Sequence, residues 1–284
     1  MPEKDQQLRH LLNAATRRLS AKLPSSARRD AERLLMHAAG VDRAFVLANP
    51  SFLLAAGVLA RYDEYIDRRF RFEPIQYIVG EQEFYGLRFE VSPDVLIPRP
   101  ETEHLVEAVL GRFDDDRAVQ IADVGTGSGA IAVAVAHSLP RAKVVALDLS
   151  KAALRIAGWN AQQHGVAGRV RLVESDLLNA VAGECFDAIV SNPPYVAVRD
   201  RPSLEEQVRA YEPEEALFAG PTGLEIYERL IPQSREHLRP GGWLLLEMGA
   251  GQEKPIERML AGWADVSFVS DLQGIPRVAC ARNK

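Results

Sequence analysis

Cysteine is scarce in this sequence, which has two, Cys185 and Cys280, among 284 residues. Two cysteines make neither a disulfide framework nor a cysteine-based metal cluster. Both lie in or beside apolar segments that are typical of strands. We therefore expect two buried thiols in a reducing cytoplasm and no metal site.

Long apolar runs are missing as well. No uninterrupted stretch approaches the roughly 18 residues that a membrane-spanning helix needs. The first residues, Met1-Pro2-Glu3-Lys4-Asp5, lack the basic and then apolar order of a signal peptide. The sequence thus predicts a cytoplasmic protein that neither crosses nor binds a membrane.

An excess of positive charge is also absent. The chain has 34 Lys and Arg residues against 39 Asp and Glu residues, which gives a formal net charge of −5 and a pI near 5.8. Proteins that bind nucleic acid usually carry a basic surface that attracts phosphates. The composition therefore argues against direct nucleic-acid binding, while the chain length is ample for one large domain and a small one.

A glycine-rich segment stands between an apolar strand pattern and an apolar helix pattern. It reads Asp123-Val124-Gly125-Thr126-Gly127-Ser128-Gly129. Glycines let a ligand lie against bare backbone, and the following helix offers unpaired N–H groups. Dinucleotide folds show G-x-G-x-x-G, whereas here an acid precedes G-x-G-x-G, and Asp123 would repel a pyrophosphate but attract a cation. S-adenosylmethionine fits better, although a lone glycine loop can also be an ordinary tight turn.

Two acids that follow later strand patterns are candidate ligands of the same nucleoside. Asp148 lies about 20 positions beyond the glycine loop, where an acid that binds the ribose hydroxyls is expected. Its alternative role is to cap the helix that begins near Ser150. Asp176 follows the strand pattern at 170–173 and can accept from an adenine amino group, or it can be only a helix cap.

The motif Asn192-Pro193-Pro194-Tyr195 follows a further strand pattern and indicates methylation of a planar nitrogen. An amide nitrogen is a poor nucleophile because its lone pair is delocalised, so its N–H groups must be held. The Asn192 side-chain oxygen and a backbone carbonyl can each accept one hydrogen, and prolines add no competing donor. Tyr195 offers a ring face to a flat acceptor group. The alternative is a plain Asn-Pro turn with a packed tyrosine.

Four segments together resemble the release factor glutamine methyltransferase family, known as PrmC or HemK. They are Ile97-Pro98-Arg99-Pro100-Glu101-Thr102-Glu103, the Asp-Val-Gly-Thr-Gly-Ser-Gly loop, Val190-Ser191-Asn192-Pro193-Pro194-Tyr195 and Leu244-Leu245-Leu246-Glu247. The resemblance spans nearly the whole chain. It implies an S-adenosylmethionine-dependent protein-(glutamine-N5) methyltransferase. Its expected partner is a class 1 peptide chain release factor, methylated on the glutamine of the Gly-Gly-Gln motif in support of translation termination.

The site residues follow from these motifs. The expected catalytic residues are Asn192, Pro193, Pro194 and Tyr195. The expected cofactor-binding residues are Gly125, Thr126, Gly127, Ser128, Gly129, Asp148, Asp176, Leu177 and Asn192. Leu177 stands where some relatives have tryptophan, so it offers adenine an apolar contact in place of stacking. No general base is obvious, and Arg99 and Glu247 either border the site or serve the structure.

The pattern of apolar residues divides the chain. Helical spacing over 8–19, 31–38, 42–48 and 51–69, with Asp42 and Ser51 as caps, predicts a substrate-recognition bundle over residues 1–72. A linker with a β-hairpin is expected at 73–97. Strand and helix patterns then alternate, which predicts a Rossmann-like α/β methyltransferase domain over 98–284 with helices on both faces of a mainly parallel sheet. Residues 195–221 predict a long loop near the site, and 265–281 an antiparallel edge hairpin.

Two other functions share part of this pattern. An adenine N6 methyltransferase would have the same Asn-Pro-Pro-Tyr motif, but it should add a basic target-recognition region and flip its base into the pocket. A non-catalytic S-adenosylmethionine-binding module would use its helical bundle only for interaction. The absence of a basic region argues against the first alternative, and the intact motif argues against the second.

Overall fold

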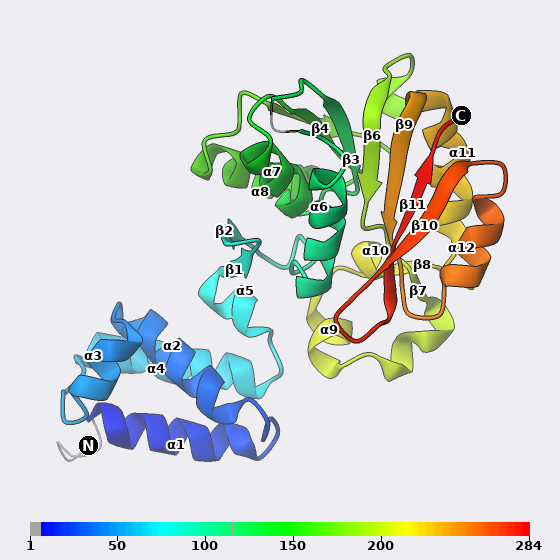
Figure 1. Ribbon diagram of the computed structural model, residues 1–284. Coiled ribbons are helices and arrows are strands. Elements are labelled where there is room, and N and C mark those ends of the chain that lie inside the picture. The colour runs from blue at the N-terminus through cyan, green and yellow to red at the C-terminus, as the bar shows by residue number, and fades with distance from the viewer. Residues whose placement is uncertain (1–6, 115) are drawn as a thin grey trace. The chain divides into compact units, whose positions relative to one another are not determined.

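A computed structural model describes residues 7–114 and 116–284 and divides the chain into two compact units (Figure 1). The first unit comprises Met1–Gly80 together with Glu205–Tyr211. The second comprises Glu81–Leu204 and Glu212–Lys284. The first unit thus continues past the boundary expected at 72, and it takes in a short segment from the second half of the chain that no sequence pattern had assigned to it.

The first unit is the expected helical bundle. Its helices are α1 (Leu8–Ser20), α2 (Ala27–Ala39), α3 (Arg43–Ala48), α4 (Ala56–Phe70), α5 (Ile75–Val79) and α9 (Glu206–Tyr211). Leucines at helical spacing along α1 and α2, among them Leu8, Leu19 and Leu34, are fully buried in its core. Burial of such a side chain contributes about 1.5–3 kcal/mol, so packing of these apolar faces holds the bundle together.

One of the two predicted helix caps in this unit is confirmed. Asp42 caps α3 by accepting a hydrogen bond of 2.7 Å from the Phe45 N–H group. The prediction that Ser51 caps the next helix is wrong, because α4 begins only at Ala56. The backbone at 50–53 is instead held in place by α1, whose Leu8 N–H group donates to the Phe52 carbonyl.

Helix α9 belongs to the bundle through polar contacts. Arg69 forms a buried ion pair with Asp30, with 2.8 Å between Nε and Oδ2, and also donates to the Gln207 side chain of α9 over 3.1 Å. The Tyr211 hydroxyl, at the end of α9, donates to the Arg71 carbonyl. The sequence pattern could not reveal this attachment, because each partner lies more than a hundred residues away.

The second unit is built on one seven-stranded sheet with the order β10-β11-β9-β6-β3-β4-β5. The strands are β3 (Gln120–Val124), β4 (Lys143–Asp148), β5 (Val170–Glu174), β6 (Phe186–Ser191), β9 (Leu238–Glu247), β10 (Ala264–Ser270) and β11 (Pro276–Arg282). Strands β5, β4, β3, β6 and β9 run parallel, and β10 and β11 form the expected antiparallel edge hairpin. The Rossmann-like fold class is confirmed.

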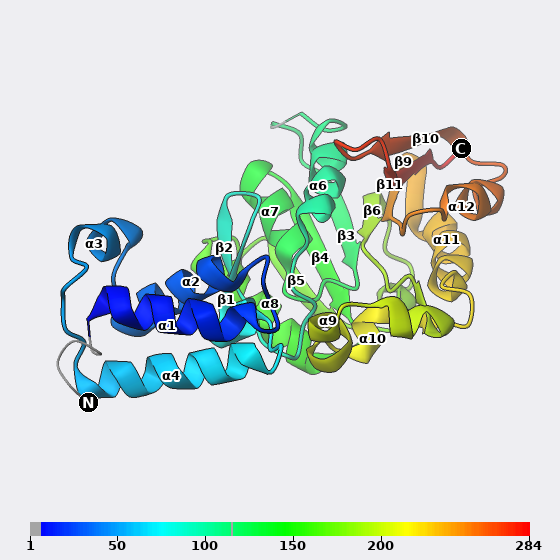
Figure 2. The same ribbon diagram turned by 90° about the horizontal axis from the view of Figure 1, so that it is seen from below.

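Helices cover both faces of this sheet. They are α6 (Glu103–Leu110), α7 (Ala130–Ser138), α8 (Lys151–Gln163), α11 (Glu225–His237) and α12 (Glu253–Met259). Figures 1 and 2 show α6, α7 and α8 on one face and α11 and α12 on the other. Successive side chains of β3 point to opposite faces, so that Ile121 joins one core cluster and Ala122 the other. Because Ala130–Ala136 are all buried, α7 is apolar all round.

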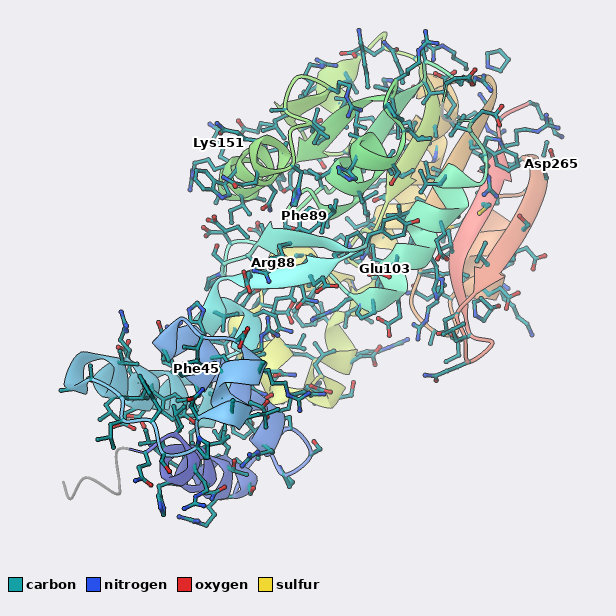
Figure 3. The ribbon with its side chains drawn as sticks, turned by 60° about the vertical axis from the view of Figure 1, so that its left-hand side comes forward. Phe45, Arg88, Phe89, Glu103, Lys151 and Asp265 are labelled. Carbon is teal, nitrogen blue, oxygen red and sulfur yellow. The ribbon has the colours of Figure 1, made fainter. Side chains whose placement is uncertain are left out.

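The hairpin expected in the linker is confirmed and belongs to the second unit. Strands β1 (Glu81–Phe84) and β2 (Leu87–Glu90) pair through the turn Tyr85-Gly86. The Tyr85 N–H group donates to the Glu103 carboxylate at the start of α6 over 2.8 Å. The buried Phe89 ring, labelled in Figure 3, lies 5.3 Å from the His164 ring. The hairpin is therefore a fixed part of this unit.

Two expectations need correction. The stretch at 195–221 is not a structureless loop, because it contains β7 (Val196–Ala197), η4 (Val198–Ser203), α9, α10 (Glu214–Leu217) and β8 (Phe218–Gly220). Cys280 is buried as expected, but Cys185 is exposed, since it lies in the turn before β6. Within residues 7–114 and 116–284, no helix combines the length and hydropathy needed to cross a bilayer.

Candidate active site

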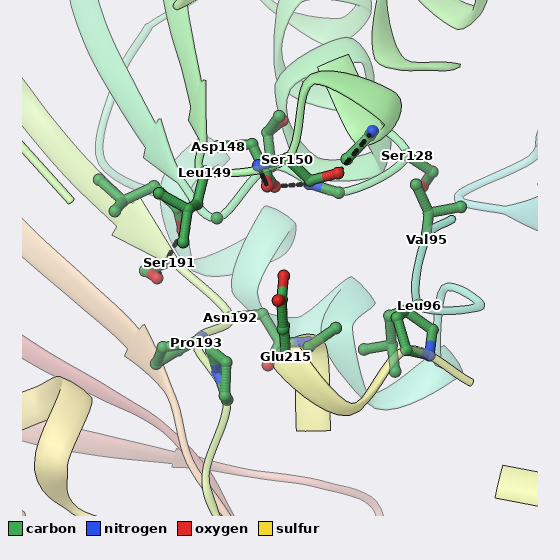
Figure 4. A pocket seen from close by; sticks show the side chains of 18 of the residues that line it. Val95, Leu96, Ser128, Asp148, Leu149, Ser150, Ser191, Asn192, Pro193 and Glu215 are labelled. Atoms are coloured by element: carbon green, nitrogen blue, oxygen red, sulfur yellow. Dashed lines mark hydrogen bonds between the residues drawn. The ribbon is translucent and has the colours of Figure 1, made fainter. Parts of the chain in front are cut away.

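A cavity of about 270 Å³ opens at the carboxyl ends of β3, β4 and β6 (Figure 4). It brings together most of the residues that the sequence singled out, namely Gly125, Thr126, Gly127, Ser128, Asp148, Asp176, Leu177, Asn192, Pro193 and Pro194. Open α/β sheets place their ligand sites at this end of the strands. Gly129 and Tyr195 are not among the lining residues.

The glycine loop is shaped by backbone conformations that other residues avoid. Gly125, Gly127 and Gly129 have φ angles of 72°, 53° and 80°. A Cβ atom added at Gly125 or Gly127 would meet no protein atom within 4 Å, so these two glycines leave open space beside the cavity. A Cβ atom at Gly129 would lie 3.0 Å from the Ala157 Cβ of α8. Gly129 therefore serves helix packing, and the other two leave room for a ligand.

The buried Asp123 carboxylate fixes the glycine loop through hydrogen bonds. Its Oδ2 atom accepts hydrogen bonds from the Thr126 hydroxyl at 2.6 Å and from the Ala132 N–H group at 3.1 Å. Burial raises the pKa of the Asp123 carboxyl to about 7, against the lowering effect of these bonds. Asp123 is fully buried and does not line the cavity, so the expected contact with a ligand cation is not observed.

Asp148 lies at the rim of the cavity and is tied to two backbone groups. Its carboxylate accepts from the Gly127 N–H group at 2.8 Å and from the Ser150 N–H group at 2.9 Å. The helix cap of α8 is Ser150, whose hydroxyl accepts from Ala153. Burial raises the pKa of Asp148, and the backbone donors oppose this rise. A carboxylate offers about four acceptor positions, so Asp148 retains capacity for ribose hydroxyls.

Asp176 and Leu177 line another part of the cavity. Asp176 pairs with Arg229 of α11, with 2.5 Å between Oδ2 and Nη2, and both side chains are about half exposed. Leu177 has an unusual positive φ of 52° and packs against the core cluster beneath α11 and α12. Asp176 and Leu177 thus give this part of the cavity a polar group beside an apolar surface, a combination that suits an adenine ring.

Three of the four residues of the Asn-Pro-Pro-Tyr motif line the cavity, and Tyr195 does not. Asn192, Pro193 and Pro194 line the cavity, and the Asn192 Nδ2 group donates to the Thr102 hydroxyl over 3.1 Å. Tyr195 packs into the core cluster beneath α11 and α12, where burial raises its pKa to about 12. Its carbonyl accepts from the Gln252 side chain at 3.0 Å. Tyr195 is therefore not among the residues that line the cavity, and its role as a stacking surface stays a prediction.

Several cavity residues were missed in the sequence. Thr102, Glu215, Ile226 and Arg229 all line it. Figure 4 shows the Glu215 carboxylate directed into the cavity from α10. A signal for this short helix was present, since Pro213 precedes two acidic residues, and acids favour the first turn of a helix.

Arg99 has a structural role in the segment that precedes α6. Its Nη2 group donates to the buried Glu212 carboxylate over 2.5 Å, and the Ile97 N–H group donates to the other oxygen of Glu212 at 3.3 Å. This pair joins the Pro-Arg-Pro segment to the chain just before α10. Of the two roles left open for Arg99, the contacts favour the structural one.

Comparisons with known proteins agree with these features along the whole chain. A family described as PrmC N-terminal domain matches residues 10–80, and one described as Methyltransferase small domain matches residues 102–208. The release factor glutamine methyltransferase of Koribacter versatilis is 47% identical over 276 residues, which cover 97% of this chain and 98% of that protein. The chain belongs to the release factor glutamine methyltransferase family. The relative from Moorella thermoacetica is 44% identical and covers 95% of this chain and 96% of its own length.

Solved structures support the fold of this methyltransferase. The Thermus thermophilus 16S rRNA N2 G1207 methyltransferase RsmC, solved with AdoMet and guanosine, has a TM-score of 0.54 and 20% identity, covering 72% of this chain and 50% of that one. A methyltransferase from Pyrococcus furiosus has a TM-score of 0.51 and 19% identity, covering 80% of this chain and 98% of that one. At these identities the likeness shows the shared fold alone.

The methyltransferase uses S-adenosylmethionine, and its cavity fits that cofactor. Gly125 and Gly127 leave space that a side chain would fill. Asp148 presents a carboxylate for hydroxyl groups, and Leu149 and Leu177 supply apolar surface. The exposed carboxylate of Glu215 adds negative charge that suits a cationic ligand. The donor and acceptor set therefore matches an amino-acid-bearing nucleoside.

Proposed function

We propose that this enzyme transfers a methyl group from S-adenosylmethionine to the side-chain amide nitrogen, N5, of the glutamine in the Gly-Gly-Gln motif of class 1 peptide chain release factors. The single observation that carries the proposal is the orientation of Asn192. Its Nδ2 group is engaged by Thr102, so its oxygen is left as an acceptor for the N–H groups of a substrate amide.

The residues of the chain contribute mainly position. Asn192 and a backbone carbonyl of the proline turn hold the two amide hydrogens, and the prolines add no donor of their own. When bound, S-adenosylmethionine supplies an electrophilic methyl group: the nitrogen–carbon bond forms as the carbon–sulfur bond breaks, the electron pair stays on sulfur, and the surplus proton leaves to water. Orientation of this kind supplies up to about 7–11 kcal/mol in favourable systems.

The proposed substrate suits a narrow pocket. A glutamine flanked by glycines can enter as a thin loop, because glycine adopts backbone conformations closed to other residues. Glutamate in its place should fail, since a carboxylate has no hydrogens to donate and would face the same acceptors with a negative charge. We assign recognition of the intact release factor to the helical unit, in the cytoplasm and without direct binding of nucleic acid.

Mass spectrometry tests the proposal. Release factor is treated with enzyme and S-adenosylmethionine, alongside a variant that carries glutamate in the motif and alongside DNA. We expect one added methyl group on the motif glutamine and none on the glutamate variant. Methylation of DNA adenine with the release factor unchanged would assign the enzyme to the adenine N6 class. An Asn192→Ala variant should lose turnover but keep cofactor affinity, and normal turnover would refute the role of Asn192.

A further inference from the structure

The turn Asn192-Pro193-Pro194-Tyr195 is fixed at both of its ends by hydrogen bonds. Where the chain leaves β6, the Ser191 hydroxyl donates to the Val124 carbonyl over 2.6 Å, and both residues are buried. Val124 is the last residue of β3 and directly precedes the glycine loop. At the other end, the Tyr195 carbonyl accepts from the Gln252 side chain over 3.0 Å. The prolines that line the cavity therefore lie between two fixed points.

Gln252 joins three separate segments of the chain through its side-chain amide. Its Nε2 atom donates to the Tyr195 carbonyl and, over 3.1 Å, to the Gly223 carbonyl just before α11. Its Oε1 atom accepts from the Gly249 N–H group, just after β9, over 2.9 Å. The backbone N–H group of Gln252 also donates to the Gly249 carbonyl over 3.1 Å. Both hydrogens of the side-chain NH₂ group are thus used, and Gln252 itself is fixed at the start of α12.

The chemistry of the partners determines the direction of the Gln252 amide. A carbonyl oxygen can only accept a hydrogen bond, and a backbone N–H group can only donate one. Gln252 must therefore present its NH₂ group to the two carbonyls and its oxygen to Gly249. Glutamate has nearly the same shape, but its carboxylate can only accept. A glutamate at this position would keep the contact with Gly249 and lose both contacts with the carbonyls.

The segments that Gln252 joins are also in close contact. Gly223 has a φ angle of 81°, and a Cβ atom there would lie 2.5 Å from the Tyr195 carbonyl oxygen and 3.1 Å from the Ala197 nitrogen. Atoms cannot approach so closely without a shift of the backbone. A side chain at position 223 would therefore displace the Tyr195 carbonyl, which is the same point that Gln252 fixes.

We propose that Gln252 is a positioning residue for methyl transfer. It fixes the end of the Asn-Pro-Pro-Tyr turn, so that the Asn192 oxygen and the backbone carbonyl of the proline turn keep the spacing that the two hydrogens of one amide require. Gln252 and Gly223 are not among the residues that line the cavity, so Gln252 acts through the turn. The inference rests on the proposed function, in which these two acceptors hold the glutamine amide.

The expected effect is large because the geometry of such a site is strict. Productive groups must lie within about 0.5 Å of their required positions, and a misplacement of about 1 Å can lower the rate about a hundredfold. The effect should fall on kcat. Binding of the intact release factor is assigned to the helical unit, and the cofactor is assigned to the glycine loop and Asp148, so neither affinity depends on the Tyr195 carbonyl.

The experiment displaces the Tyr195 carbonyl in two independent ways. Gln252→Glu replaces its donors with acceptors, Gln252→Met removes them without adding charge, and Gly223→Ala crowds the carbonyl with a methyl group. Gln162→Glu adds the same charge at an exposed position of α8 and is the control for Gln252→Glu. Gly241→Ala is the control for Gly223→Ala, because Gly241 has a φ angle of 78° and a Cβ atom there would meet nothing within 4 Å.

For each protein we measure kcat and KM on the release factor, the Kd for S-adenosylmethionine, and the thermal midpoint, with kinetics run well below the lowest midpoint. Gln252→Glu, Gln252→Met and Gly223→Ala should lower kcat about tenfold to a hundredfold, with KM and Kd close to the wild-type values. Gln162→Glu should match the wild type. Gly241→Ala should have a lower midpoint, because alanine is strained in the left-handed conformation, but it should retain kcat.

Three results would overturn the inference. The first is a wild-type kcat in Gln252→Glu and Gln252→Met. The second is an equal loss of kcat in Gly223→Ala and Gly241→Ala, which would assign the loss to backbone strain. The third is a rise in the Kd for S-adenosylmethionine as large as the fall in kcat, which would show that Gln252 only supports the cofactor cavity. If the wild type does not methylate the release factor, the proposed function itself fails, whereas methylation by the wild type with any of these three results refutes the inference alone.

Discussion

Gly127 and Gly129 stand two positions apart in the same loop, and the structure predicts different main consequences for an alanine at each. Both residues have positive φ angles, 53° and 80°. A Cβ atom at Gly129 would lie 3.0 Å from the Ala157 Cβ and 3.1 Å from the Ala157 Cα of α8, whereas one at Gly127 would meet nothing within 4 Å. Gly129→Ala should therefore reduce stability, and Gly127→Ala should reduce cofactor binding.

The magnitudes follow from these distances. A left-handed backbone conformation costs an alanine about 1–2 kcal/mol at either position. Crowding against Ala157 adds about 1–3 kcal/mol at Gly129, since the backbone of α8 must move. Each kcal/mol lowers the thermal midpoint by about 2–4 °C in a domain of this size. At Gly127 the new methyl group instead occupies cavity space, and we expect about a tenfold loss of S-adenosylmethionine affinity or more.

Two measurements on each variant decide the matter. Thermal unfolding without ligand gives the stability, and isothermal titration calorimetry gives the Kd for S-adenosylmethionine, each against the wild type. Gly129→Ala should have a lower thermal midpoint than Gly127→Ala. Gly127→Ala should bind S-adenosylmethionine more weakly than Gly129→Ala does. Equal midpoints would refute the packing role of Gly129. Wild-type affinity in Gly127→Ala would show that the ligand does not lie against this part of the loop.

Three other predictions concern separate parts of the chain. Asp148→Ala should weaken S-adenosylmethionine binding tenfold to about a hundredfold, the range for hydrogen bonds to a charged group, and an unchanged Kd in calorimetry would leave Asp148 only a support for the loop. Arg69→Ala should destabilise the helical unit by about 3–5 kcal/mol, because Asp30 stays buried without its ion-pair partner. In the same denaturant titration Arg18→Ala, which breaks a half-exposed pair, should cost under about 1 kcal/mol. Folding raises the pKa of Glu247 from 4.5 to about 7, so the protonated carboxyl stabilises the folded state below pH 4.5 and this contribution is lost as the pH rises through 7. Relative to Glu247→Gln, the free energy of unfolding of the wild type should fall by about 1.4 kcal/mol between pH 6 and pH 8. Parallel plots of the free energy of unfolding against pH for the two proteins would contradict this.

Local patterns in the sequence predicted the elements whose cause is local. The periodicity of α1 and α2, the Asp42 cap and the β-hairpin of the linker depend on residues close in the chain, and the structure confirms them. The alternation of strands and helices likewise predicted the mainly parallel sheet.

Features that depend on distant partners were missed or misread. Tyr195 has a ring suited to stacking, but the ring packs beside Gly249 and against the core cluster beneath α11 and α12, and Tyr195 is not among the residues that line the cavity. Asp123 was also misread, although its partners are near in the sequence: the Thr126 hydroxyl and the Ala132 N–H group, 3 and 9 positions on, both donate to one of its oxygens. The direction in which each side chain points was decided by tertiary packing, which spacing along the chain does not record.

The attachment of α9 to the helical bundle bears on the design of chimeric enzymes. The chain leaves the bundle after Gly80, returns for Glu205–Tyr211, and leaves it again before Glu212. An exchange of the bundle between relatives at one junction would pair a foreign Arg69 and Arg71 with the resident Gln207 and Tyr211. An exchange that keeps the packing of the bundle intact must therefore carry two discontinuous pieces of sequence, with residues 205–211 included.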